Sequence, residues 1–224
     1  MPLVLLTRPQ AAAEQTAARI KAATLWPVML APMATIEMLA PPPPLAASAV
    51  VLTSANAAPA LAPYRHLPVF AVGDQTASAA RAAGCTLVQS AAGDAPTLAK
   101  LVQQQLPEGR VVYLSGQNVR HDLAALLPNY EVIRQVVYRS IPATSLPSEA
   151  AAALQSGQVR AVLFYAKSAM ETLSGLTEQR PPAFCLSAAL VVPGWPTLTI
   201  APAPTEEALL ETLYSAYDKN QTAS

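Results

Sequence analysis

The sequence predicts an α/β fold of two similar parallel-sheet domains joined by a two-stranded linker ladder, with a discontinuous first domain. Three observations predict it: short apolar runs that alternate with helical stretches, an internal repeat, and two extended segments beside Pro-rich stretches. The 224 residues suffice for one large domain or two small ones. A hydrophobic fraction of 52% against 12% charged residues supplies ample apolar surface for packed cores.

Eight short apolar runs, each bounded by turn residues, predict the strands. They are rich in Val, Leu and Ile and apolar on both faces, as in a parallel sheet that is covered on both sides. The runs are residues 3–6, 49–52, 69–72, 86–88, 111–114, 161–164, 183–186 and 198–200.

Stretches with helical periodicity follow most of these runs. Apolar residues gather on one face in residues 98–106, 119–127 and 209–217. Start signals agree, with Asp94, Ser148 and Thr205 each placed before a helical stretch. Strands that alternate with helices indicate an α/β fold with right-handed crossovers.

The two halves of the chain resemble each other. Four pairs of segments match: residues 50–57 with 162–169, 69–73 with 183–187, 84–88 with 194–200, and 4–8 with 112–116. The offset is about 110 residues throughout, half of the chain, which predicts two similar α/β units.

The order of the repeated elements predicts that the chain starts in one domain, builds the other entirely, and returns. The N-terminal strand and helix match the last strand and helix of the middle block, not its first. We therefore predict domain 1 from residues 1–34 and 142–224, domain 2 from residues 39–133, and linker strands at 35–38 and 134–141. A Pro tetrad at 41–44 makes a stiff spacer, and an ordinary surface loop is its alternative.

Composition excludes several classes of function. The formal net charge is zero, which argues against a nucleic-acid partner, and no apolar run approaches the ~18 residues of a membrane helix. The N-terminus has no basic leader, so we expect a buried first strand and a cytoplasmic protein. Cys85 and Cys185 lie far apart and are interpreted as small apolar residues in a reducing compartment.

Known cofactor and metal motifs do not occur, and we expect no cofactor and no metal. Instead, strands are followed by a small or hydroxyl residue and then a helix. Ligands bind at the carboxyl ends of parallel strands, where helix N-termini bind anions, so we expect these residues to line one cleft between the domains. Helix capping is the alternative for each of them. The candidates are Thr7, Arg8, Ser54, Gly73, Thr76, Ser115, Gly116, Ser168 and Ser187.

Five segments carry a family resemblance. They are residues 6–9 (LTRP), 52–57 (LTSANA), 71–77 (AVGDQTA), Gly116 followed by Arg120 and Leu123, and residues 137–139 (VYR). With their order, their spacing and the permuted repeat, they resemble the uroporphyrinogen-III synthase family over nearly the whole chain. The family is similar in having two α/β domains joined by a two-stranded ladder.

The resemblance implies a lyase of tetrapyrrole (haem) biosynthesis that needs no cofactor. Its substrate, hydroxymethylbilane, is a linear tetrapyrrole with eight carboxylates. The reaction removes the terminal hydroxyl, inverts the last pyrrole ring through a spiro intermediate and closes the ring to uroporphyrinogen III. The resemblance adds Asn56 and Arg120 to the substrate-binding candidates.

The resemblance also implies a catalytic role for Tyr138. Its phenol would donate a hydrogen bond or a proton as the C–O bond of the substrate breaks. Strand alternation is expected to put Tyr138 on the same face as Val136 and opposite Val137. The alternative is a tyrosine that only packs on the strand.

The second repeat departs from the family pattern. Residues 186–190 (LSAAL) lack Gly-x-x-Thr-Ala, and residues 166–168 (AKS) replace a frequent Thr-Ser-Pro-Ser, which leaves the roles of Ser168 and Ser187 open. Two alternatives therefore stand beside the enzyme: a non-catalytic, two-lobed tetrapyrrole-binding protein and a degenerate synthase paralogue. We expect a monomer, and transient contact with hydroxymethylbilane synthase stays open.

Overall fold

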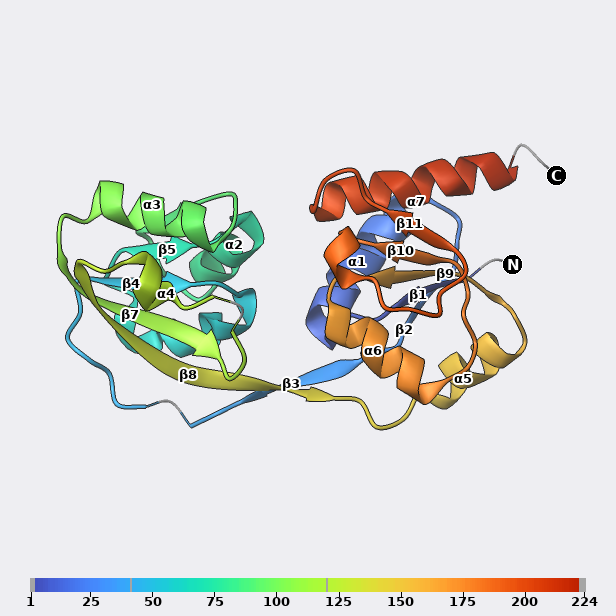
Figure 1. The fold of residues 1–224 in the computed structure, drawn as a ribbon, viewed down its shortest axis with the longest axis horizontal. Coiled ribbons are helices and arrows are strands. Elements are labelled where there is room, and N and C mark those ends of the chain that lie inside the picture. Colours follow the sequence, from blue (N-terminus) through green and yellow to red (C-terminus); the bar gives the residue numbers. More distant parts are fainter. Residues whose placement is uncertain (1–2, 41, 120, 222–224) are drawn as a thin grey trace. The chain divides into compact units, whose positions relative to one another are not determined.

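Figure 1 shows the computed structural model, which describes residues 3–40, 42–119 and 121–221, the last five of these without their side chains. The chain divides into two compact units. Unit 1 consists of Met1–Thr35 and Ile141–Ser224, and unit 2 of Ile36–Ser140. Each unit has its own sheet.

Unit 1 is built on a five-stranded sheet in the order β11-β10-β9-β1-β2, in which all pairings are parallel. The strands are β1 (Leu3–Leu6), β2 (Val28–Leu30), β9 (Val159–Phe164), β10 (Ala183–Cys185) and β11 (Leu198–Ile200). The helices are α1 (Gln10–Ala23), α5 (Ser148–Gln155), α6 (Lys167–Leu176) and α7 (Glu206–Gln221), with a 3-10 turn η2 (Ala188–Leu190).

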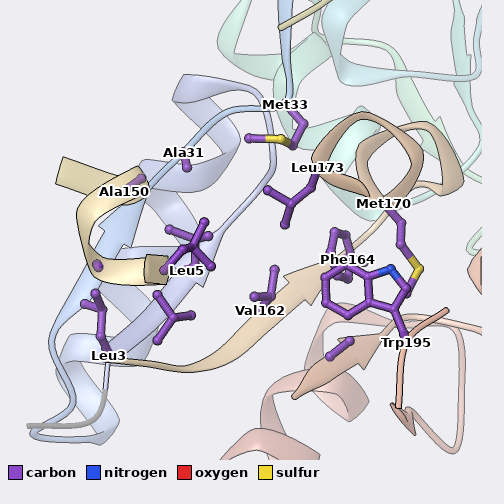
Figure 2. Packing of buried hydrophobic residues seen from close by; sticks show 14 of the residues in the cluster. Leu3, Leu5, Ala31, Met33, Ala150, Val162, Phe164, Met170, Leu173 and Trp195 are labelled. Carbon is purple, nitrogen blue, oxygen red and sulfur yellow. The ribbon is translucent and has the colours of Figure 1, made fainter. Parts of the chain in front are cut away.

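Both faces of this sheet are covered. On one face, α5 and α6 pack over a core that contains Leu5 and Phe164 (Figure 2). The rings of Phe164 and Trp195 meet edge to face there, with centroids 5.1 Å apart. On the other face, α1 and α7 pack over a core that contains Leu6 and Leu209.

Unit 2 carries a six-stranded sheet in the order β3-β8-β7-β4-β5-β6, and β8, β7, β4, β5 and β6 pair in parallel. The strands are β3 (Ala34–Met38), β4 (Ala49–Leu52), β5 (Val69–Ala71), β6 (Val88–Ser90), β7 (Gly109–Gly116) and β8 (Tyr130–Pro142). The helices are the 3-10 helix η1 (Ala55–Tyr64), α2 (Asp74–Ala82), α3 (Ala95–Gln105) and α4 (Leu123–Leu126). One face packs against η1 and α2, the other against α3 and α4.

The predicted α/β class is confirmed, and all eight predicted strands occur. The strand predicted at residues 86–88 is found further along the chain, as β6 (Val88–Ser90). Strand β2 was not predicted, because its three residues form a very short apolar run between Pro27 and Pro32. No helix among the described residues is long and apolar enough to cross a membrane.

The helix predicted over residues 119–127 is wrong in length, since only the four residues of α4 are helical among the residues of this range that the structure describes, 119 and 121–127. Asp122 begins this helix, because its Oδ1 accepts a hydrogen bond from the Ala124 N–H at 3.0 Å. Pro128 follows closely and limits its continuation. The predicted caps Asp94 and Thr205 do accept hydrogen bonds from helix N–H groups, whereas Pro147, not Ser148, precedes α5.

Candidate functional site

In both units, the first polar residues after the buried strands stand at the carboxyl ends of the sheet. Thr7 directly follows β1, and its hydroxyl donates to the carbonyl of Leu163 at 2.7 Å. The Thr7 side chain is almost fully buried, at 1% exposure. Its hydroxyl therefore joins the ends of two neighbouring strands.

Arg8 belongs to an internal polar cluster of unit 1. Its Nη1 donates to Glu206 Oε1 at 2.6 Å and to the hydroxyl of Thr16 at 3.0 Å. The guanidinium carbon lies 4.2 Å from the centroid of the Tyr165 ring. Only 12% of the Arg8 side chain is exposed. The cation predicted to bind substrate is thus already paired with a carboxylate.

Glu206, the first residue of α7, is the centre of this cluster. It also accepts hydrogen bonds from the hydroxyls of Thr16 and Tyr165 and from Arg19. Burial, and then the Glu206 charge, raise the pKa of Tyr165, so this phenol stays protonated and donates. The cluster ties the end of β1 to α1 and to the start of α7.

The remaining unit 1 candidates have no such partners. Ser168 lies exposed in the first turn of α6, and Ser187 precedes η2 half-buried. Within the described part of the chain, neither hydroxyl has a hydrogen bond, so neither serine caps its helix through its side chain.

In unit 2, three strand ends carry predicted residues. The Ser54 hydroxyl accepts a hydrogen bond from the Asn56 N–H at 3.2 Å, so Ser54 caps the N-terminus of η1, as the alternative reading of this residue expected. Gly73 begins α2, and a Cβ built on it meets nothing within 4 Å. Thr76 is buried in the first turn of α2. The backbone at Gly73 is therefore open to a ligand. Arg120 lies outside the described residues.

A β-bulge at the end of β7 and β8 decides the position of Tyr138. Ser115 lies opposite Val136, but the next residue, Gly116, lies opposite Tyr138, so Val137 is an extra residue in β8. Because Ser115 and Gly116 point to opposite faces, their partners Val136 and Tyr138 do so too. The expectation that Val136 and Tyr138 share a face is wrong for this reason.

Gly116 is needed because the Tyr138 ring lies against its backbone. A Cβ added to Gly116 would stand 2.6 Å from Cζ and 2.8 Å from the hydroxyl oxygen of Tyr138. The tyrosine is half-buried, and in the described part of the chain its hydroxyl has no hydrogen-bond partner. This phenol is therefore held in place by packing and is open to donate to a ligand.

A pocket of about 420 Å³ opens beside the same strands in unit 2, and we call it the Arg134 pocket. Its lining includes Tyr113, Val119, His121, Leu123, Val132 and Arg134. Arg134 donates from Nε to Ser115 Oγ at 2.8 Å and from Nη2 to the carbonyls of Gly116 and Gln117 at 2.8 and 2.6 Å. The hydroxyls of Tyr113 and Thr53 lie 2.7 Å apart, and burial raises the pKa of Tyr113.

Arg134 and Tyr113 line this pocket but were not predicted as site residues. Arg134 was assigned only to a linker strand, and His121, which lies exposed just before α4, was not among the predicted site residues. The register that sets Arg134 beside Ser115 brings residues 19 positions apart into contact. No local motif in the sequence carries this signal.

The fold and these strand-end groups define an α/β protein whose candidate site is made of neutral and cationic hydrogen-bond donors. The family model described as uroporphyrinogen-III synthase HemD matches residues 14–211. The chain therefore belongs to the uroporphyrinogen-III synthase family, and the resemblance found in the sequence is confirmed.

Solved structures of this family share the fold. Uroporphyrinogen-III synthetase from Helicobacter pylori aligns with a TM-score of 0.65 and 17% identity, over 96% of this chain and 100% of that chain. A mutant uroporphyrinogen III synthase from the extremely thermophilic bacterium Thermus thermophilus aligns with a TM-score of 0.54 and 18% identity, over 98% and 100%. The search of curated proteins gives no match.

We predict that Arg8→Ala destabilises unit 1 by about 1.5–3 kcal/mol, because Glu206 loses a charged hydrogen-bond partner in a poorly solvated cluster. Urea unfolding followed by tryptophan fluorescence measures this, since Trp26 and Trp195, the two tryptophans of the chain, are both in unit 1. The control is Arg110→Ala, which breaks an exposed pair with Glu131 in unit 2. An unchanged fluorescence midpoint in Arg8→Ala would contradict the structural role.

We predict that Gly116→Ala costs about 1–3 kcal/mol, because its methyl group collides with the Tyr138 ring. Thermal and urea unfolding followed by circular dichroism measure the loss. The double variant Gly116→Ala/Tyr138→Ala should recover part of it relative to the sum of the single variants. Gly175→Ala, where nothing lies within 4 Å, is the control and should be neutral or slightly stabilising. Strict additivity in the double variant would rule out the packing argument.

Proposed function

We propose that this protein is an active uroporphyrinogen-III synthase, which converts hydroxymethylbilane into uroporphyrinogen III with inversion of the last pyrrole ring. Beyond family membership, one observation supports it: the phenol of Tyr138 is fixed against Gly116, half-buried, and its hydroxyl has no partner within the described residues.

Tyr138 would act on the leaving hydroxyl of the substrate. As the C–O bond breaks, the departing oxygen gains negative charge, and a phenol at hydrogen-bond distance stabilises that charge or supplies the proton with which water leaves. A phenol is a hydrogen-bond donor that carries no negative charge to repel the substrate carboxylates, so it can stand beside them. The pyrrole system then carries the positive charge until the ring closes through the spiro intermediate.

We propose that strand-end groups of both units bind the substrate carboxylates, largely through backbone N–H groups. The proposed residues are Thr7, Arg8, Ser54, Asn56, Gly73, Thr76, Ser115, Gly116, Arg120, Ser168 and Ser187. The open backbone at Gly73 supports this assignment most directly. Arg8 would have to share its charge between Glu206 and the ligand, so its contribution to binding should be modest.

We also propose that the two units are domains joined by residues 35–38 and 134–141, and that the protein is a cytoplasmic monomer. The strand orders, with two separate sheets, support the first part. Cys85 and Cys185 are both free and buried, which fits a reducing compartment.

A degenerate paralogue that binds tetrapyrrole without turnover is the second candidate. The observation that favours it is an asymmetry between the repeats: β5 is followed by the nine-residue α2, whereas β10 is followed by the three-residue η2. The ligand-facing helix N-terminus of unit 2 therefore has only a short counterpart in unit 1.

We expect the purified protein to convert freshly made hydroxymethylbilane into the III isomer without added metal or nucleotide. Chromatographic separation of isomers I and III after oxidation measures it, with a protein-free sample for the spontaneous reaction. Production of isomer I at the spontaneous rate would favour the degenerate paralogue. Activity lost with a chelator and restored by a metal would contradict the proposed chemistry.

We expect Tyr138→Phe to fold normally, to bind substrate and to lose roughly 10-fold to 1000-fold in turnover, because only an unpaired hydroxyl is removed. Single-turnover kinetics measure the loss. Tyr130→Phe is the matched control: it removes a phenol on the same strand that donates to the Leu106 carbonyl, and should keep its turnover. Wild-type turnover in Tyr138→Phe would leave Tyr138 as a packing residue.

A further inference from the structure

Arg134 carries a positive charge that its hydrogen bonds do not neutralise. Its three acceptors are the Ser115 hydroxyl and two backbone carbonyls, all of them neutral. Among the described residues it has no ion pair, and no hydrogen bond is made by its Nη1. Elsewhere in unit 2, Arg110 and Arg139 are paired with Glu131 and Glu37.

The three hydrogen bonds fix the orientation of the guanidinium. Nε and Nη2 are both held at the end of β7, at distances of 2.6–2.8 Å, so the side chain loses little further freedom when a ligand binds. An oriented guanidinium binds a carboxylate through short, charge-assisted hydrogen bonds. Arg134 is thus prepared for an anion.

The other walls of the Arg134 pocket suit one carboxylate arm of a ligand and the apolar ring that carries it. Val119, Leu123 and Val132 supply apolar surface, and the volume of about 420 Å³ lies in the range of small-molecule sites. Asp122 also lines the pocket, with its Oδ1 bound to the Ala124 N–H. Its negative charge disfavours a second carboxylate beside the first.

We propose that the Arg134 pocket binds one carboxylate arm together with its pyrrole ring, with the carboxylate on the guanidinium of Arg134 and the ring against Val132 and Leu123. The identity of this ligand rests on the proposed function, since each ring of that substrate bears carboxylate arms. The pocket therefore acts as a side-chain-based subsite, which adds to recognition through backbone N–H groups.

The test uses the full chain and a monopyrrole with a single propionate arm, compared with its methyl ester. Titrations followed by amide NMR and by the Arg134 Nε resonance give both affinities. In the wild-type protein, the acid should bind at least tenfold more tightly than the ester and should shift the resonances of Leu123 and Val132. Equal binding of acid and ester, or shifts confined to other residues, would overturn the proposal.

Arg134→Gln should remove the preference for the acid and leave the binding of the ester within about twofold, an effect that a merely structural role would not give. Arg110→Gln changes the net charge equally and should keep the preference. If Arg134→Gln fails to fold, variants of the exposed Val119 provide the test instead. Val119→Asp should weaken acid binding at least threefold relative to Val119→Asn. A retained acid preference in Arg134→Gln, or no difference between the Val119 variants, would contradict the subsite.

The experiment separates this proposal from the proposed function. Probe binding is measured without turnover. If the wild-type protein binds the acid at Arg134 but makes no isomer III, the proposed subsite is supported and the proposed activity is contradicted. If the wild-type protein makes isomer III but does not distinguish the acid from the ester, the proposed activity is supported and the proposed subsite is contradicted.

Discussion

Burial of both sheets on both faces is the constraint on which the rest of this structure depends. Strands β1 and β4 are buried at every residue, which leaves no room for polar side chains along them. Backbone groups in the strands are satisfied by parallel pairing, so polar chemistry is confined to the strand ends. Thr7, the first polar residue after β1, shows the consequence: it is buried and its hydroxyl bonds to the neighbouring strand.

The same constraint explains which parts of the fold the sequence predicts well. Apolar runs such as residues 49–52 and 161–164 are short, apolar at every residue and bounded by turns, and they lie within strands β4 and β9. Predictions weaken where burial is partial. Strand β2, which was not predicted, is only half-buried. The helix predicted from Val119 begins at α4 instead, because the Asp122 side chain caps its N-terminus, and this local hydrogen bond outweighs the apolar spacing.

The candidate site was predictable in its location but not in its contacts. Strand ends with hydroxyl residues can be found in the sequence, because they follow apolar runs. The pair between Arg8 and Glu206 spans 198 residues, and the bulge that turns Tyr138 to the other face depends on the register of two strands. Neither leaves a local signature, since the consecutive apolar residues Val136, Val137 and Tyr138 do not show which one is the extra residue of the bulge.

The arginines at the strand ends of the two units differ in the partners that they bind. In unit 1, Thr7 and Arg8 are bound to a carbonyl and a carboxylate of their own unit, so a ligand must compete with those partners. In unit 2, the hydroxyl of Tyr138 has no partner among the described residues, and the charge of Arg134 faces only neutral acceptors. Both groups meet the backbone of Gly116, one through its ring and one through the carbonyl oxygen. A change at Gly116 therefore bears on both the proposed acid and the proposed carboxylate subsite, because the Tyr138 ring packs on its backbone and Arg134 donates to its carbonyl.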